Sequence, residues 1–361
     1  MSSSQTSRAR LGVDIGGTFT DVALEAGARR HTIKVLTTVS PEEGVMEGVA
    51  AVLGKAGMSL GDIDLIIHGT TLATNALIER KGATTALITT EGFRDSVEMG
   101  TESRFEQYDV FMDKPPPLVP RRRRHVVAER LDARGKVLLP LDEAGVEALV
   151  PALERDAVES VAIGFLHSFV NPDHEQRTRD ILAARLPDLA ITLSSDVSPE
   201  MREYERFSTA CANAYVQPLM ARYLTRLEIQ LGERGFAGTL FVMLSGGGVA
   251  TLETAIRFPV RLVESGPAGG AIFASHIAAE SGLDRVLSFD MGGTTAKICL
   301  IDDAKPQTAR SFEVARIYRF LKGSGLPIRI PVIEMVEIGA GGGSLAHIDQ
   351  TGRIAVGPES A

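Results

Sequence analysis

Short runs of apolar residues alternate with polar residues and glycines along most of the chain, and their spacing changes from segment to segment. Residues 31–38 alternate with a period of two, which predicts a strand with one buried face. Residues 63–67 are mostly apolar, which is typical of a strand buried on both faces. Residues 40–57 carry apolar positions three or four apart, open with a Ser-Pro-Glu-Glu capping box and end at a glycine, so we predict a helix. This succession indicates an α/β protein.

Further strands are predicted at residues 84–89 and 160–167, and further helices at 142–154 and from 172 onward. A long helical pattern runs from residue 198 to 231, and Pro218 inside it is expected to kink or divide the helix. We expect this helical segment to link two lobes. The predicted organisation is a tail (1–9), an N-terminal lobe (10–200), linking helices (201–235) and a second lobe (236–361).

Two segments far apart in the chain repeat one plan. Residues 11–22 read L-G-V-D-I-G-G-T-F-T-D-V, and residues 288–299 read S-F-D-M-G-G-T-T-A-K-I-C. In each, a strand ends in Asp, one residue intervenes, and Gly-Gly-Thr turns the chain into a second strand. Glycine adopts positive φ at low cost and lets backbone amides approach an anion closely. One such hairpin is equally typical of a plain tight turn, but the pair favours two phosphate loops that clamp a nucleoside triphosphate between two lobes.

The polar residues of both hairpins indicate binding of ATP with a magnesium ion. The residues expected to approach the phosphates are Gly16, Gly17, Thr18, Gly292, Gly293, Thr294 and Thr295. Asp14 and Asp290 would repel a bare phosphate, so we expect them to hold Mg²⁺ or its water shell, with Asp21 beside them. Lys297 stands where the first hairpin has Thr20 or Asp21, and it could hold a phosphate or be an ordinary strand-surface lysine. The chain has no Walker or Rossmann phosphate motif.

Another polar cluster follows the strand at residues 63–67 and reads H-G-T-T-L-A-T-N. A strand that leads through Gly-Thr-Thr into a helix leaves free backbone amides at the helix start, which suit an anion or a carbonyl group. We therefore expect His68, Thr70, Thr71 and Asn75 to face a pocket. The alternative is a capped helix with a hydrogen-bonded core histidine.

Glycines also gather in three later loops, at residues 245–248, 264–270 and 337–349. The first two are expected at joints between a strand and a helix, where backbone amides such as those of Gly246 and Gly247 would contact a nucleotide. The third loop is expected to be a turn between two strands.

Bulk composition argues against several classes of protein. The 361 residues carry a net charge of −8, which disfavours a general nucleic-acid or anionic-membrane surface, so the basic run at 121–124 is expected to be a solvated surface leading into a strand. No apolar run reaches ~18 residues and the start lacks an apolar leader, so neither a membrane span nor a signal peptide is predicted. Cys211 and Cys299 lie in apolar patterns, which predicts two reduced, buried thiols in a cytoplasmic protein.

Taken together, these motifs resemble those of the A-type subunits of the hydantoinase/oxoprolinase family, from about residue 10 to the end of the chain. The motifs are D-I-G-G-T-F-T-D, H-G-T-T-L-A-T-N-A, S-G-G-G, E-S-G-P-A-G-G, F-D-M-G-G-T-T-A-K and E-I-G-A-G-G-G-S. The hairpin pair alone resembles the phosphate loops of the actin-like ATPase superfamily. The resemblance implies an α/β fold of actin-like (ribonuclease H-like) lobes, the second incomplete here because family members are longer.

What the resemblance implies is ATP-dependent ring opening of a cyclic amide such as a hydantoin or oxoproline, through phosphorylation of its carbonyl oxygen. It also implies a B-type partner subunit. Carried over to this chain, the residues of the two hairpins named above form the phosphate and magnesium loops, and His68, Thr70, Thr71 and Asn75 line the reacting end. Two alternatives stay open: a subunit of an ATP-dependent acetone or acetophenone carboxylase, and a truncated, non-catalytic fragment. A sugar kinase would need a hydroxyl-activating aspartate, which no pattern singles out.

Overall fold

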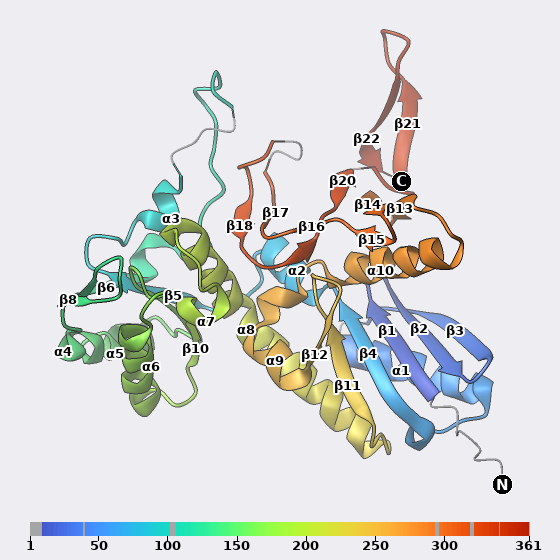
Figure 1. Cartoon of the computed structure of the whole chain (residues 1–361), viewed down its shortest axis with the longest axis horizontal. Helices are drawn as coiled ribbons and strands as arrows, with labels where there is room; N and C mark the ends of the chain where they lie inside the picture. Colours follow the sequence, from blue (N-terminus) through green and yellow to red (C-terminus); the bar gives the residue numbers. More distant parts are fainter. Residues whose placement is uncertain are drawn as a thin grey trace.

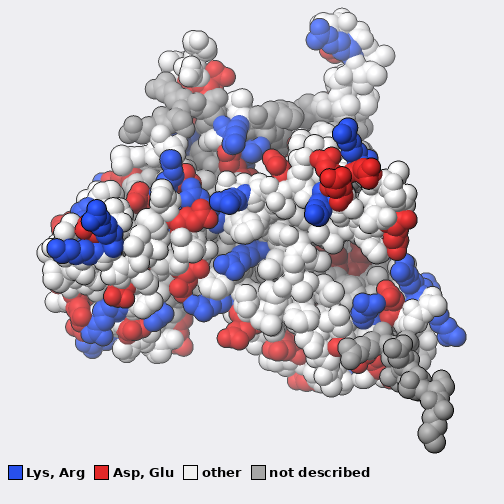
Figure 2. Space-filling model, viewed as in Figure 1, with Lys and Arg blue, Asp and Glu red and all other residues white. Residues whose placement is uncertain are grey.

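The computed structural model of the chain describes residues 9–38, 40–101, 106–292, 296–317, 321–338 and 340–360. It has the predicted α/β architecture, with a six-stranded sheet, a parallel four-stranded sheet and a second four-stranded sheet near the C-terminus (Figure 1). No helix in these ranges is both long and apolar enough to cross a membrane. Basic and acidic side chains are interspersed over the face drawn in Figure 2.

The six-stranded sheet is built from segments that lie far apart in the sequence. In spatial order its strands are β12 (Val249–Thr251), β11 (Thr239–Met243), β4 (Ile63–Thr70), β1 (Ala9–Ile15), β2 (Phe19–Ala26) and β3 (Arg29–Leu36). β1 pairs antiparallel with β2 and parallel with β4, and β4 pairs parallel with β11. The sheet therefore crosses the boundary expected at residue 236, because later strands extend a sheet that begins near the N-terminus.

Alternation along β1 explains how this sheet packs. Leu11, Val13 and Ile15 are buried, while the residues between them are exposed. The three side chains share one core with Val49 of α1 (Pro41–Ala56) and with Leu224 of α8 (Glu203–Glu233). A period of two on the strand and of three to four on the helices thus places one apolar face of each element in the same core.

The helix predicted after residue 40 is α1, and its two ends differ in how well the sequence predicted them. Gly57 ends it in the left-handed conformation, with φ of 68°, as expected for a C-terminal glycine. The predicted capping box is wrong, because the Ser40 side chain makes no capping hydrogen bond. Instead the backbone oxygen of Ser40 accepts a hydrogen bond from the Glu43 amide, at 3.0 Å.

A second, parallel sheet of four strands forms a separate layer, at the left of Figure 1. Its strands in spatial order are β10 (Ala190–Leu193), β9 (Ser160–Gly164), β5 (Thr85–Thr90) and β6 (Arg124–Val127). The helices packed with it are α4 (Glu143–Glu147), α5 (Val150–Arg155) and α6 (Asp173–Arg185). The single helix predicted at 142–154 is therefore two helices, the second of which has Pro151 in its first turn, where proline is tolerated.

Helix α8 connects the cores of the two sheets. Near its start, Phe207 and Cys211 pack with Leu87 of the four-stranded sheet, and Leu224 belongs to the core of the six-stranded sheet. The helix begins at Glu203 rather than at residue 198 and continues through Pro218. The helix is therefore not divided at this proline, because apolar packing on both sides holds the two halves in one helix.

The third sheet lies beside α10 (Ser265–Glu280). It contains β13 (Arg285–Met291), β14 (Ala296–Asp302), β15 (Lys305–Pro306) and β20 (Val336–Ile338). β13 and β14 form the second predicted antiparallel pair. Cys299 and Ile301 are buried in a core with Ala268 of α10, which confirms the expected burial of this cysteine.

Short elements complete the fold. They are η1 (Leu60–Asp62), α2 (Leu72–Ile78), α3 (Ser96–Met99), η2 (Arg121–Arg123), β7 (Arg130–Leu131), β8 (Val137–Leu139), α7 (Ser194–Val197), α9 (Leu252–Arg257), η3 (Pro259–Leu262), β16 (Thr308–Ala309), β17 (Phe312–Val314), β18 (Leu326–Ile328), β19 (Val332–Ile333), β21 (Ser344–Ile348) and β22 (Ile354–Ser360). One residue of the basic run at 121–124 departs from its prediction. The Arg124 side chain is buried, ion-paired with Glu98 at 2.6 Å and bonded to the Val119 carbonyl oxygen, so it is not solvated.

Candidate functional site

The first predicted phosphate hairpin is the connection from β1 to β2. Its two aspartates face each other, because Asp14 is the register partner of Asp21. The Gly16 amide donates to the Phe19 carbonyl oxygen at 2.9 Å, and a Cβ on Gly16 would come within 3.1 Å of that oxygen. Neither Gly16 nor Gly17 has a positive φ, so the expected use of positive φ by these glycines is wrong. At Gly16 the glycine permits a close backbone approach rather than a left-handed turn.

The Asp14 carboxylate lies against two glycines from other elements. A Cβ on Gly69, at the end of β4, would be 2.7 Å from Asp14 Oδ1, and a Cβ on Gly266, in the first turn of α10, would be 3.3 Å from it. Both positions must therefore lack a side chain for the carboxylate to stay where it is. The carboxylate marks the point where β1, β4 and the start of α10 meet.

Negative charge gathers around Asp14 without full compensation. Neighbouring protein atoms withdraw its carboxylate from water and, as the largest cause, raise its pKa; the charges of Asp21 and Asp290 raise the pKa further, while Lys34 lowers it. The residue as a whole is nonetheless exposed to solvent. Lys34 is already paired with Asp21, at 2.6 Å. Three carboxylates near one lysine form a site that a cation would stabilise.

These carboxylates can supply only part of the ligands that Mg²⁺ requires. Carboxylate oxygens are suitable ligands for this ion, which commonly takes one or two of them together with phosphate oxygens and water. In the described part of the chain, no group of three or more His, Cys, Asp or Glu residues could hold a metal ion. The residues therefore suit an ion that arrives with a phosphate ligand rather than one bound by protein atoms alone.

The second hairpin joins β13 to β14, and its charges differ from those of the first. Asp290 is the register partner of Lys297, so the lysine takes the place that Asp21 has opposite Asp14. Lys297 forms an ion pair with Glu264, the residue directly before α10. Glu264 has φ of 65°, and its amide donates to Thr74 Oγ1 at 3.0 Å. Lys297 is therefore an anchored, half-buried lysine.

The glycine residues of this hairpin are only partly described. Gly292 accepts a hydrogen bond from the Gly342 amide at 2.9 Å, which joins the loop at 337–349 to the hairpin. That loop connects β20 to β21, as predicted. The predicted phosphate residues Gly293, Thr294 and Thr295 lie outside the described residues.

The H-G-T-T segment connects β4 to α2, and its side chains bond mainly within the protein. His68 is fully buried, and its Nε2 is 2.8 Å from the hydroxyl of Tyr223 in α8. Burial lowers the pKa of His68 to about 4, so its imidazole is neutral at pH 7. This arrangement is that of the core-histidine alternative. A partner 155 residues away leaves no signal in the local sequence.

The other three residues of this segment tie it to the first hairpin and to α2. Thr71 Oγ1 donates to the Ile15 carbonyl oxygen at 3.1 Å, and Thr70 Oγ1 accepts from the Leu72 amide at 3.2 Å. Asn75 Nδ2 lies 3.4 Å from Thr71 Oγ1. The Thr70 carbonyl oxygen accepts from Ser265 Oγ at 3.2 Å, which joins the segment to α10.

The two glycine loops after β11 occupy different places. The loop at 245–248 turns β11 into β12, with the Leu244 amide donating to the Gly248 oxygen at 2.8 Å, so the predicted joint between a strand and a helix is wrong there. Gly247 has φ of 83°, and a Cβ on it would lie 2.8 Å from Ile272 of α10; a Cβ on Gly246 would lie 3.3 Å from the Pro331 oxygen. The second loop, 264–270, enters α10 from η3 rather than from a strand.

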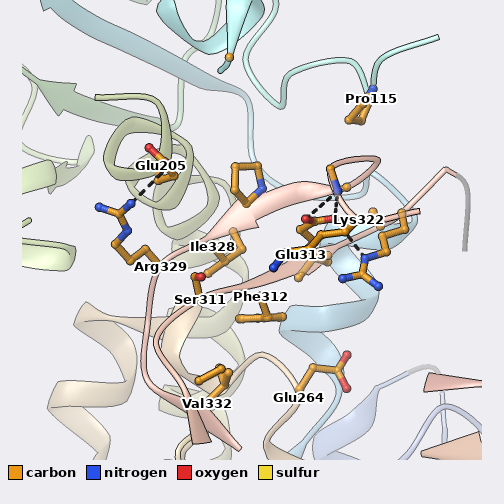
Figure 3. Close-up of a pocket in the computed structure, with 18 of the residues that line it drawn as sticks. Pro115, Glu205, Glu264, Ser311, Phe312, Glu313, Lys322, Ile328, Arg329 and Val332 are labelled. Carbon is orange, nitrogen blue, oxygen red and sulfur yellow. Dashed lines mark hydrogen bonds and ion pairs between the residues drawn. The ribbon is translucent and has the colours of Figure 1, made fainter. Parts of the chain in front are cut away.

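A cavity of about 960 Å³ lies beside the Glu264–Lys297 pair. Its walls come from the segment around α3, the start of α8, the β17–β18 hairpin and β20 (Figure 3). Figure 3 also shows Arg329 joined to Glu205, a pair whose charged atoms are 3.5 Å apart. The prediction missed this cavity, because the segment from residue 309 to 335 carries no motif and the elements in its described residues are two or three residues long.

Comparison with known proteins assigns both halves of the chain to family models. Residues 10–186 match the model described as hydantoinase/oxoprolinase N-terminal region, and residues 206–361 match the model described as hydantoinase/oxoprolinase. The caprolactamase subunit alpha of Pseudomonas jessenii is 36% identical over 98% of this chain and 50% of its own length.

Two solved structures are similar over nearly the whole chain. The crystal structure of ATP-dependent caprolactamase from Pseudomonas jessenii superposes with a TM-score of 0.83, at 35% identity, over 98% of this chain and 51% of that chain. The nucleotide-free structure of acetone carboxylase superposes with a TM-score of 0.82, at 27% identity, over 97% of this chain and 51% of that chain. The chain thus spans about half the length of the relatives it matches.

Proposed function

The chain belongs to the hydantoinase/oxoprolinase family, and from this premise we propose that it binds Mg·ATP and uses it to open the ring of a cyclic amide. ATP-dependent transformation of a cyclic amide or a ketone is the chemistry named for its relatives. The observation that carries the proposal is the Asp14 carboxylate, held between Gly69 and Gly266 with two further carboxylates near it.

In this proposal the two hairpins are the phosphate loops of an actin-like ATPase. Asp14 and Asp290 would hold the magnesium ion, with Asp21 beside them. The ion would neutralise charge on the phosphates during transfer. Lys297 would supply a positive charge on the opposite hairpin, and the glycine amides of both turns would approach the phosphates.

In the proposed reaction, phosphorylation overcomes the weak electrophilicity of the amide carbonyl carbon. The carbonyl oxygen of the cyclic amide attacks the γ-phosphorus, and the bond from phosphorus to the ADP oxygen breaks. Water then adds to the activated carbon, the carbon–nitrogen bond breaks and the ring nitrogen takes a proton, which leaves an acyl phosphate. A second water hydrolyses this acyl phosphate to a carboxylate and phosphate. The protein contributes mainly by positioning and by neutralising charge.

A second candidate is ATP-dependent carboxylation of a ketone. It is favoured by the nearly equal structural similarity to acetone carboxylase and to caprolactamase, with TM-scores of 0.82 and 0.83. In either reaction we propose that a partner subunit of the B type takes part, because the caprolactamase relative is named as a subunit. Dependence of ATP consumption on bicarbonate separates the two candidates.

The test is calorimetric binding of Mg·ATP to the 361-residue chain, followed by measurement of ADP release with cyclic amides, alone and with a B-type subunit. We expect Asp14→Ala and Asp290→Ala each to lower nucleotide-dependent turnover by at least ~100-fold, as for other losses of transition-state charge stabilisation. Asp64→Ala is the control, because Asp64 is an exposed aspartate near the opposite end of β4. Near-normal turnover in either site variant would refute the phosphate-loop assignment.

A further inference from the structure

Lys297 stands in the third sheet with an acidic residue on each side. It lies on β14, where its register partners are Asp290 of β13 and Glu337 of β20. Residues directly opposite each other in antiparallel strands project from the same face of a sheet, and opposite charges in such positions attract each other. The sheet itself therefore offers Lys297 two carboxylate partners.

Lys297 nevertheless pairs with a third carboxylate, from outside the sheet. In the described part of the chain, its Nζ is ion-paired with Glu264, directly before α10, and with neither of its cross-strand neighbours. The side chains of Lys297 and Glu264 are 17% and 25% exposed, so the pair is partly withdrawn from water. Charges attract each other more strongly there than on an open surface. The pair therefore fixes the position of the Lys297 ammonium group.

The backbone of Glu264 is held in a conformation that residues other than glycine rarely adopt. Its φ of 65° and ψ of 23° lie in the left-handed region. Its amide donates to Thr74 Oγ1 at 3.0 Å, which ties it to α2. Such a conformation persists only where the surrounding structure holds it, and it is common at functional sites. Glu264 thus offers its carboxylate from a fixed point, whereas the four-carbon side chain of Lys297 is flexible.

The pair lies at the edge of the acidic site. Gly266, two residues after Glu264, is close to Asp14, because a Cβ on this glycine would be 3.3 Å from Asp14 Oδ1. Lys297 shares a sheet face with Asp290, the second aspartate assigned to the magnesium ion. The positive charge assigned to the phosphates is therefore neutralised by Glu264 before a nucleotide arrives.

We propose that Glu264 is a positioning residue that holds Lys297 away from the phosphates until Mg·ATP binds. Binding then exchanges the Glu264 carboxylate at Lys297 Nζ for phosphate oxygens. The released carboxylate stays hydrated, because Glu264 lines a cavity of about 960 Å³, which has room for water. The apparent affinity for Mg·ATP is lowered by the fraction of the chain in which the pair is closed. The inference rests on the proposed function and adds to it a control of nucleotide affinity.

The test is a double-mutant cycle, with Mg·ATP binding to the 361-residue chain measured by calorimetry. We expect Glu264→Gln to bind Mg·ATP about fivefold more tightly than the native chain, which corresponds to ~1 kcal/mol for an ion pair of this kind. Lys297→Met should bind at least ~10-fold more weakly, because a charge-assisted hydrogen bond to phosphate is lost. In the Lys297→Met chain, the added Glu264→Gln change should have little effect, because no lysine is left to release.

Glu337→Gln is the matched control. It removes the same charge from a cross-strand neighbour of Lys297 that is exposed, lines the same cavity and is not ion-paired with the lysine in the described part of the chain. The control measures the effect of lower negative charge alone, which solvent and salt screen at an exposed position. We expect it to change Mg·ATP affinity by less than about twofold.

A structure of the native chain with magnesium and a non-hydrolysable ATP analogue provides a measurement that needs no variant. We expect Lys297 Nζ to donate to a phosphate oxygen and to lie beyond about 4 Å from the Glu264 carboxylate, which is the limit for an ion pair.

Three results would overturn the inference: an intact Glu264–Lys297 pair beside the bound analogue, equal Mg·ATP affinities of Glu264→Gln and Glu337→Gln, or a fivefold gain from Glu264→Gln that persists in the Lys297→Met chain. The proposed function stands in all three cases, because the nucleotide binds. Absence of Mg·ATP binding by both the native chain and Glu264→Gln would instead refute the proposed function, and the inference with it.

Discussion

Replacing Gly69 by alanine tests whether the position of the Asp14 carboxylate matters. Gly69 is the last residue but one of β4, and its φ is not positive, so alanine can adopt its backbone conformation. The added methyl group would come within 2.7 Å of Asp14 Oδ1, whereas ordinary van der Waals contact begins at 3.4 Å. The carboxylate must therefore withdraw by about 0.7 Å, the difference of these two distances.

The displaced atom is the end of a flexible side chain that reaches solvent, so the fold can accommodate the change. Glycine within a strand is less stable than alanine by roughly 0.5–1 kcal/mol, and this gain partly offsets the cost of moving the carboxylate. We expect the free energy of unfolding to change by less than about 1 kcal/mol. Catalysis should respond far more strongly, because a misplacement of about 1 Å can cost ~100-fold in rate.

The assay is Mg·ATP-dependent turnover together with urea unfolding, for Gly69→Ala and two comparison variants. A Cβ on Gly12, in the neighbouring strand, has nothing within 4 Å, so Gly12→Ala should retain full turnover. The turnover of Gly266→Ala should lie between those of Gly69→Ala and Gly12→Ala, because the Cβ at position 266 would be 3.3 Å from Asp14 Oδ1. Equal turnover in Gly69→Ala and Gly12→Ala would refute the reasoning, as would loss of turnover that is explained by unfolding.

Three further outcomes are expected. The pKa of Asp14 is raised above 3.8, so the folded state loses stability as pH rises from about this value through the folded pKa. The melting temperature of Asp14→Asn should therefore increase relative to that of the native chain between pH 4 and 7. A difference in melting temperature that does not depend on pH would contradict this prediction. The pKa of His68 is lowered from 6.5 to about 4, so stability present above pH 6.5 should decline by roughly 3 kcal/mol on acidification to pH 4, and His68→Phe should lack this decline in urea titrations at the two pH values. Burial raises the pKa of Cys211 to about 12, so this thiol should resist iodoacetamide at pH 8 in the folded chain and react after unfolding, as read by mass spectrometry.

The sequence was informative about local structure, because neighbouring residues decide it. Alternation in the two D-x-G-G-T segments predicted strand pairs, and register then places Asp14 opposite Asp21 and Asp290 opposite Lys297. The helix that ends at Gly57 follows from apolar spacing and from the ease with which glycine takes positive φ. In each of these cases the interacting residues lie within a few turns or one hairpin of each other.

Contacts between distant segments could not be predicted in this way. The extension of the first sheet by β11, the bond from His68 to Tyr223 and the burial of Arg124 depend on how complete elements pack. A local pattern shows only that a residue faces inward, and it does not identify the partner that satisfies a buried polar group.

The same distinction between local patterns and contacts of distant segments applies to the candidate site. The sequence by itself determined which chemical groups are available: aspartates near the ends of strands, glycine turns, and a lysine in the second hairpin. Only the tertiary structure decided that the Asp14 carboxylate lies between Gly69 and Gly266, and that a cavity adjoins Glu264. The physical reason is that short-range sterics and alternation select strands and turns, whereas the approach of β1, β4 and α10 results from burial of apolar surface shared among many residues.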